Sequence, residues 1–124
     1  MDKLGGPAVE KAYNYLLWLI PVLEKLPRTQ RFLIGDRIQS AAIDVVELLT
    51  DAIYTRDRKG LLRTAQLRIE RQRILMRALC DLRFLDLSRY EFSARELDEI
   101  GRMTGGWIKA HMARQKEKTN AKTP

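Results

Sequence analysis

The sequence predicts an all-α protein folded as an antiparallel, up-down-up-down four-helix bundle. Apolar residues recur at intervals of three and four along four long stretches, which is the spacing of one face of an α-helix. Glycine and proline are scarce, with 7 and 4 among 124 residues. A chain of this length folds as one domain with its own core. We expect a flexible N-terminus at residues 1–6, the bundle at residues 7–113 and a basic, disordered tail at residues 114–124.

The first helix is expected over residues 7–26. Pro7 suits the first helical position, where a missing N–H costs nothing. Pro21 is expected to kink the helix or to interrupt its hydrogen bonds. The most apolar segment, residues 13–26, is too short to span a membrane. We therefore expect a helix that packs in a core.

The second helix is expected over residues 30–55, with Thr29 as its N-cap. Its predicted apolar face begins at Phe32 and includes Ile38, while the opposite face carries Asp36, Ser40, Asp44, Glu47 and Asp51. A dinuclear metal site in a bundle needs Glu-x-x-His pairs, and the chain has a single histidine. We predict no metal. The acidic residues are either a solvated face or partners for the arginines of another subunit.

The basic run over residues 56–85 organises the chain, and it is expected to form the third helix after a short junction at residues 57–60. At 100° per residue, its polar side chains fall on one narrow arc: Arg63, Gln66, Glu70, Arg73, Arg77 and Asp81. Apolar residues cover more than half of the circumference, whereas one stripe is enough for a helix of a lone bundle. The surplus predicts two buried surfaces, one inside the bundle and one against a second subunit.

Two groups of residues are assigned to helix packing or to oligomer contacts. Arg68 and Arg71 lie inside the apolar sector of the third helix, where they either line an interface or extend from its edge toward water. In the fourth helix, the glycines next to Trp107 are costly in a helix and predict a close helix crossing or a subunit contact. The alternative is a weak helix end. The glycines are Gly101, Gly105 and Gly106.

The fourth helix is expected to begin at Ser88, the first residue of a Ser-x-x-Glu-like capping sequence, with Ser93 as the alternative start. Its predicted inward residues are Leu97, Ile100, Gly101, Thr104, Trp107, Ile108 and Met112. His111 is expected near the C-terminal end of this helix, where a cation meets the negative end of the helix dipole.

The formal net charge of +7 is unevenly distributed. Residues 56–83 carry nine basic and three acidic side chains, and residues 102–124 carry six and one. Clustered positive charge attracts a polyanion by releasing its counterions. We expect a nucleic-acid surface; the alternative is charge that only maintains solubility.

The sequence carries no arrangement of residues that indicates an enzyme. It has no phosphate-binding loop, no paired cysteines, no HExxH and no G-x-S-x-G. Cys80, the single cysteine, is expected to be a small core residue in a cytoplasmic protein. We predict no catalytic residue, no cofactor, no small-molecule substrate and no membrane association.

Four segments resemble one known family: residues 26–42, 61–77 and 82–92, and most specifically residues 96–109, ELDEIGRMTGGWIK. Together they resemble the accessory variability determinant (Avd) proteins of diversity-generating retroelements, within a wider four-helix-bundle family that includes the 23S rRNA intervening-sequence proteins. The resemblance covers about residues 7–112. Thr104 stands where the family more often has an apolar residue.

The resemblance implies a cytoplasmic protein, encoded by a bacterium, an archaeon or a phage, that forms a basic, barrel-shaped homopentamer. It implies binding to the reverse transcriptase of the retroelement and to its template RNA, with DNA as an alternative nucleic acid, in support of error-prone cDNA synthesis (mutagenic retrohoming). The alternative is a protein of the intervening-sequence type, RNA-associated or purely structural, without a reverse transcriptase. The residues that we assign to nucleic-acid or partner binding are Arg58, Lys59, Arg63, Arg73, Arg77, Lys109, Arg114, Lys116 and Lys118.

Overall fold

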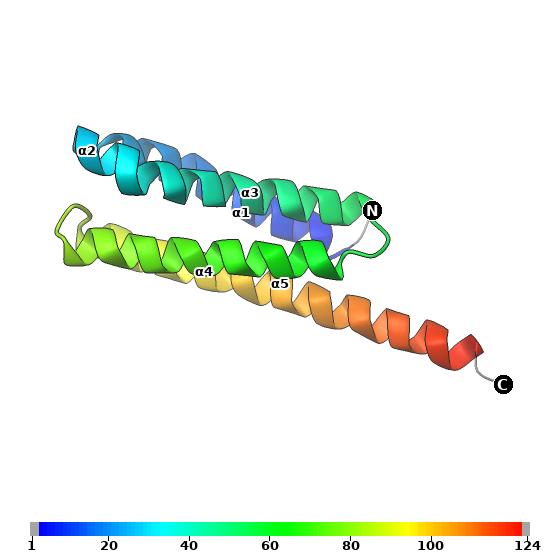
Figure 1. Ribbon diagram of the computed structural model, residues 1–124. Helices are drawn as coiled ribbons and strands as arrows, with labels where there is room; N and C mark the ends of the chain where they lie inside the picture. Colours follow the sequence, from blue (N-terminus) through cyan, green and yellow to red (C-terminus); the bar gives the residue numbers. More distant parts are fainter. Residues whose placement is uncertain (1–2, 123–124) are drawn as a thin grey trace.

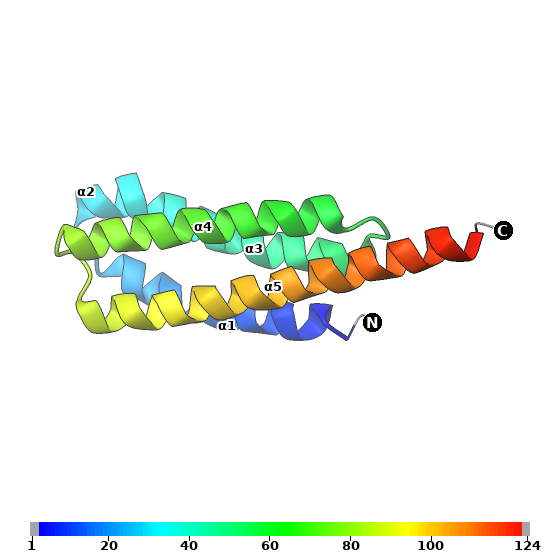
Figure 2. The same cartoon turned by 90° about the horizontal axis from the view of Figure 1, so that it is seen from below.

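Four long helices lie side by side in the computed structural model, which describes residues 3–122 (Figure 1). They are α1 (Gly5–Glu24), α3 (Asp36–Tyr54), α4 (Lys59–Asp81) and α5 (Leu87–Lys122). Each long helix packs on two others: α3 on α1 and α4, and α5 on α4 and α1. Successive long helices run in opposite directions (Figures 1 and 2). The predicted all-α fold is confirmed, and no strand occurs in residues 3–122.

The core lies between the four long helices. Its fully buried side chains include Leu19, Ile38, Leu49, Leu62 and Leu79, so every one of α1, α3 and α4 contributes, and α5 adds Leu97, Ile100 and Trp107. Burying each large apolar side chain stabilises the fold by about 1.5–3 kcal/mol. No helix among the described residues has both the length and the apolar character needed to cross a bilayer.

The helix α1 begins at Gly5, two residues before the predicted start, and it continues through Pro21 to Glu24. Pro21 lies within the last turn of α1. The backbone hydrogen bond that is lost with the N–H of Pro21 is therefore close to the end of the helix. Gly5 and Gly6, which we expected to be flexible, are helical, and Gly5 is buried. Met1 and Asp2, the start of the expected flexible segment, lie outside the described residues.

The second predicted helix consists of three consecutive segments: α2 (Arg28–Gln30), the π-helical turn η1 (Arg31–Gly35) and α3. The N-cap is Pro27, so the assignment of Thr29 as the cap was wrong. The carbonyl of Pro27 already accepts a hydrogen bond from the Arg31 amide at 2.9 Å, which places Thr29 inside the first turn. Phe32 is 55% exposed, so its assignment to the apolar core face was also wrong.

The helix α4 begins at Lys59, inside the junction expected at residues 57–60, and it ends at Asp81, before the predicted end at residue 85. Arg83 adopts a left-handed backbone conformation with φ 66°. This conformation ends helices and is usually supplied by glycine. The amides of Phe84 and Leu85 then donate to the Leu79 carbonyl at 2.8 and 3.2 Å.

The helix α5 is capped by Asp86, whose carboxylate accepts a hydrogen bond from the Arg89 amide at 2.7 Å. The assignment of Ser88 as the cap was therefore wrong, and Ser93 is a fully buried residue inside the helix. The helix continues to Lys122, past the residue where we expected regular structure to end, and its last turns extend beyond the bundle (Figure 2). Met112, which we expected to face inward, is 43% exposed.

Candidate nucleic-acid and partner interface

The tightest contact between helices involves Trp107, which is 1% exposed. A Cβ placed on Gly5 would lie 2.8 Å from the Trp107 ring and 2.7 Å from Ile53, so only glycine lets α1 come this close to α5 and α3. The guanidinium of Arg58 lies over the same ring, 5.5 Å from its centroid. Trp107 therefore fixes both the start of α1 and the connection between α3 and α4.

This anchoring places the basic residues of the α3–α4 connection next to the basic extension of α5. Two adjoining hollows, of about 540 Å³ and 120 Å³, lie between the two segments. Their lining includes five cations from two distant parts of the sequence, which we call the C-terminal basic cluster: Arg56, Arg58, Lys59, Arg114 and Lys118.

The C-terminal basic cluster has little internal compensation. Asp57 is the one carboxylate that lines the two hollows, and its Oδ1 lies 3.8 Å from Nε2 of His111. Among residues 3–122, Arg56, Lys59, Arg114 and Lys118 form no ion pair with a carboxylate. Arg114 and Lys118 are four residues apart and therefore share one face of α5. Like charges held close together repel one another, so binding of an anion that neutralises them lowers the free energy.

His111 does not lie near a helix end, so the helix-dipole role that we expected was wrong. The helix continues eleven residues further, to Lys122. The imidazole is 8% exposed and stands in the wall of both hollows, below the cations.

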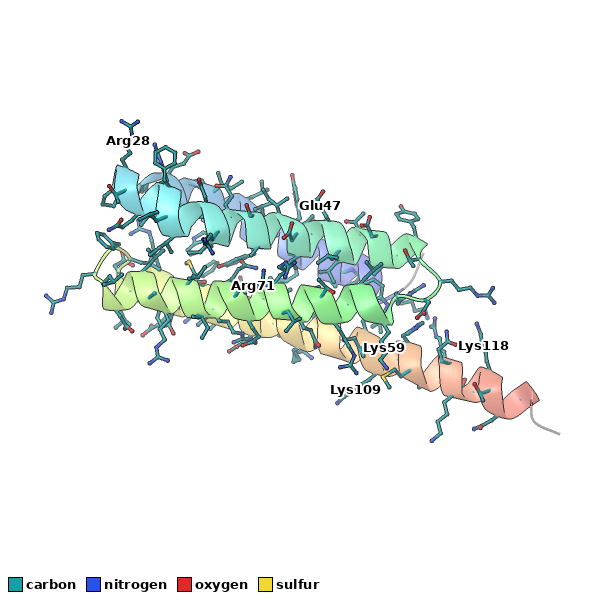
Figure 3. All side chains as sticks on the ribbon, viewed as in Figure 1. Arg28, Glu47, Lys59, Arg71, Lys109 and Lys118 are labelled. Carbon is teal, nitrogen blue, oxygen red and sulfur yellow. The ribbon has the colours of Figure 1, made fainter. Side chains whose placement is uncertain are left out.

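The structure brings only some of the predicted binding residues into this cluster. Lys59, Lys109 and Lys118 lie at the same end of the molecule, where α5 leaves the bundle (Figure 3). Lys109 is exposed on α5 but does not line either hollow. Lys116 is two residues from both Arg114 and Lys118, a spacing that turns it to another side of the helix. Arg63 is exposed one turn after Lys59 on α4.

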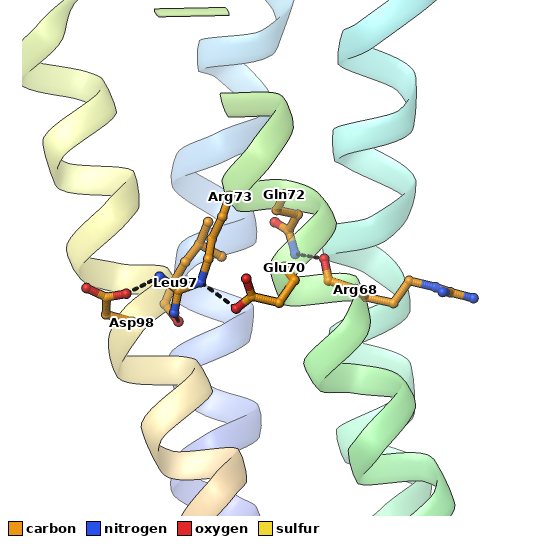
Figure 4. A network of polar contacts seen from close by, with 6 residues as sticks. All are labelled: Arg68, Glu70, Gln72, Arg73, Leu97 and Asp98. Atoms are coloured by element: carbon orange, nitrogen blue, oxygen red, sulfur yellow. Dashed lines mark hydrogen bonds and ion pairs between the residues drawn. The ribbon is translucent and has the colours of Figure 1, made fainter. Parts of the chain in front are cut away.

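Arg73 and Arg77, in contrast, are paired with carboxylates of their own chain. Nε of Arg73 lies 2.9 Å from Glu70, and its Nη1 contacts Asp98 of α5 (Figure 4). Arg77 lies 3.7 Å from Asp81. Arg73 joins α4 to α5, and the ion pairs with Glu70 and Asp81 lie within α4. The carboxylates therefore partly neutralise both arginines before any partner binds. Sequence periodicity places Glu70 and Asp81 on the same arc as these arginines, but it gives no sign of the contact with Asp98 on α5.

Arg68 and Arg71 lie on the other side of α4, toward α3. Nε of Arg68 donates to Asp44 of α3 at 3.2 Å, while Arg71 is exposed (Figure 3). A shallow groove of about 830 Å³ runs between α3 and α4 there. Leu67 and Ile74, which line it, are 61% and 65% exposed.

The three glycines of α5 differ in their surroundings. A Cβ on Gly101 would lie 3.4 Å from Arg73 Nη2, and one on Gly105 would lie 3.4 Å from Gln66 Nε2. Both positions face α4, at ordinary contact distance from flexible side chains. A Cβ on Gly106 would meet nothing within 4 Å.

Arg56 belongs to the C-terminal basic cluster but was not among the predicted binding residues. The sequence signal that it offers is its position beside Arg58 and Lys59 in a short connection. Among residues 3–122, no three His, Cys, Asp or Glu side chains gather as a metal site would require.

The family described as bAvd-like matches the chain over residues 8–111. The matched region contains almost all of the bundle and ends before Arg114, so the α5 part of the C-terminal basic cluster lies beyond it. No curated protein and no solved structure gives a match.

Proposed function

The chain belongs to the bAvd-like family, and from that premise we propose that it is an accessory protein of a diversity-generating retroelement. In this role it binds the reverse transcriptase and the template RNA of the element and supports mutagenic cDNA synthesis. The family is one of accessory, non-catalytic proteins associated with such elements. The chain acts as a scaffold that holds template and polymerase together.

The observation that carries this proposal is the C-terminal basic cluster. Its cations come from two segments and surround two hollows that contain one carboxylate. A nucleic acid suits such a surface, because the cations that neutralise its phosphates release the counterions condensed along its backbone. The planar guanidinium of Arg114 suits bidentate contact with a phosphate, while the lysines contribute point charges.

A scaffold of this kind needs no chemistry of its own. Binding template and polymerase to one body turns their encounter into an intramolecular event with a high effective concentration. Several copies in one ring would present several basic clusters to the same RNA, which multiplies this effect without any new contact.

We further propose that the chain assembles into a homopentamer through the groove between α3 and α4. Leu67 and Ile74 expose apolar surface there, on the face of α4 that is turned away from its own core. Arg71 on α4 and Asp36 on α3 border the groove with opposite charges. Charges of both signs flank this apolar surface, with Asp36 and Arg37 on α3 and Glu70 and Arg71 on α4. Against a different face of the next copy the groove makes a head-to-tail contact, and such contacts form a ring when the rotation between copies closes.

The test is a tagged purification from the native host at physiological salt, with the bound protein and RNA identified by mass spectrometry and sequencing. The proposal expects a reverse transcriptase together with one template RNA. Recovery of bulk ribosomal RNA without a polymerase would instead support the intervening-sequence type of protein. Recovery of the chain alone would contradict binding of either partner.

A further inference from the structure

The corner between α1 and α3 carries an exposed aromatic side chain that the core does not use. Phe32 is 55% exposed, and Leu33 beside it is 64% exposed. They lie in η1, a π-helical turn. Such turns are rare and are frequent at functional sites. The exposure of these two side chains does not result from a loop, because helical structure continues on both sides of η1.

Two arginines flank this ring. The guanidinium carbon of Arg28 lies 5.8 Å from the centroid of Phe32, and that of Arg31 lies 5.6 Å from it. Neither arginine forms an ion pair with a carboxylate among residues 3–122. Residues 25–35 contain three basic residues and no acidic one. The acidic residues Glu24 and Asp36 stand next to the two ends of this range. The corner therefore presents an aromatic surface beside two arginines that form no ion pair with these or other described carboxylates.

This corner is separate from the C-terminal basic cluster. Arg28 and Lys118 lie at opposite ends of the molecule (Figure 3). The 19 residues of α3 between the two ends span roughly 28 Å.

We propose that the corner is a second contact site for single-stranded nucleic acid, where an unpaired base stacks on Phe32 and the adjacent phosphates pair with Arg28 and Arg31. The inference rests on the proposed binding of template RNA and adds a preference for unpaired segments of it. Aromatic rings and guanidinium planes in a basic surface are the elements that hold single strands without reading their sequence. A base inside a duplex offers no free face to the ring.

A protein partner would use this corner less well. A stable protein interface buries about 800 Å² on each side, and its core is depleted of charge. Here two apolar side chains stand between two arginines. A nucleotide can stack its base on the ring of Phe32 while its phosphate pairs with the arginines.

The experiment measures binding of a fluorescent single-stranded RNA of about six nucleotides, and of a duplex of the same length, to the full chain at low and physiological salt. When stacked, a strand of this length spans roughly 20 Å, which is less than the length of α3 between the corner and the C-terminal basic cluster. The variants are Phe32→Ala, Phe32→Trp and Leu33→Ala. Both positions are exposed, so circular dichroism and melting temperature are expected to stay unchanged in all three variants.

We expect Phe32→Ala to weaken binding of the single strand by about tenfold and to change the affinity for the duplex little. Phe32→Trp and Leu33→Ala are expected to bind the single strand about as well as the wild type. Arg28→Gln is expected to lower the salt dependence by about one counterion. Unchanged single-strand binding in Phe32→Ala, together with loss of binding in Arg114→Glu, would overturn this site and leave the proposed function intact. A wild-type chain that binds neither RNA would overturn both. In the tagged purification, loss of the reverse transcriptase but not of RNA in Phe32→Ala would assign the corner to a protein and overturn the inference.

Discussion

The guanidinium of Arg58 lies 5.5 Å above the ring of Trp107 and thereby fixes the α3–α4 connection against α5. Nε of Arg58 also donates to the Thr55 carbonyl at 3.2 Å, which holds the connection in place from its other side. The same ring contacts Gly5 at the start of α1. One buried indole thus joins three segments, and the C-terminal basic cluster is assembled around it.

The contact between Gly5 and Trp107 predicts a large effect from a single methyl group. In Gly5→Ala the new Cβ would overlap the rigid indole and Ile53 at 2.7–2.9 Å, so α1 must move. We expect the free energy of unfolding to fall by about 1–3 kcal/mol, as measured by urea denaturation.

Gly106→Ala is the matched control, because a Cβ there meets nothing within 4 Å of the chain. Alanine is the better helix former, so the free energy of unfolding is expected to rise by up to about 1 kcal/mol. Equal effects of the two substitutions would contradict the packing described here. A loss of oligomer in Gly106→Ala would assign Gly106 to a subunit contact.

The buried pair of Tyr15 and Ser93 predicts a pH dependence of stability. Their hydroxyl groups lie 2.6 Å apart in the core, and burial raises the pKa of the Tyr15 phenol above its ordinary range, against the opposing effect of the Ser93 hydrogen bond. The unfolded chain releases this proton near pH 10 while the folded chain keeps it. The contribution to stability is therefore complete below about pH 10 and is lost as the pH rises further.

The test compares the unfolding free energies of the wild type and Tyr15→Phe between pH 8 and pH 11. The difference between them is expected to shrink or reverse above about pH 10, because phenylalanine has no proton to lose. Lysines titrate in the same range in both proteins and cancel in the comparison. A difference that does not change with pH would show that the phenol is not buried as described.

The exposed apolar surface of the α3–α4 groove predicts how the oligomer can be broken. Ile74→Glu places a charge in the proposed subunit interface and is expected to lower the mass in light scattering to that of one chain, with helicity unchanged. Leu87→Glu is the control, because Leu87 is 62% exposed, like Ile74 at 65%, but lies at the start of α5 away from the groove. Equal oligomer masses for wild type and Ile74→Glu would exclude this interface.

The four helices could be predicted from the sequence because their apolar spacing extends over many turns. The inward residues Leu97, Ile100 and Trp107 all lie in the core. The helix ends were harder to predict, because several capping residues compete locally. Asp86 caps α5 in preference to Ser88, and Arg83 ends α4 in a conformation for which the sequence offers no glycine.

The charged surface was predictable in composition but not in its arrangement. Periodicity placed Arg73 on the outside of α4, but only the packing of α5 brings Asp98 to it. In the same way, Arg56 and Arg114 are far apart in the sequence and meet only because α5 continues past the bundle. Contacts between distant segments decide which cations are free, and a single sequence does not contain them.

The charge reversal Arg114→Glu/Lys118→Glu tests whether the C-terminal basic cluster binds the template RNA. The affinity for the template RNA is measured over a range of salt concentrations. The control is Arg89→Glu/Arg102→Glu, which changes the net charge equally but alters arginines already paired with Asp86 and Glu99.

We expect the cluster variant to lose at least about tenfold in affinity and its salt dependence to fall by about two counterions, while the control changes much less. Equal losses in the two variants would rule out the cluster as the binding site, because RNA would then respond to the net charge of the chain.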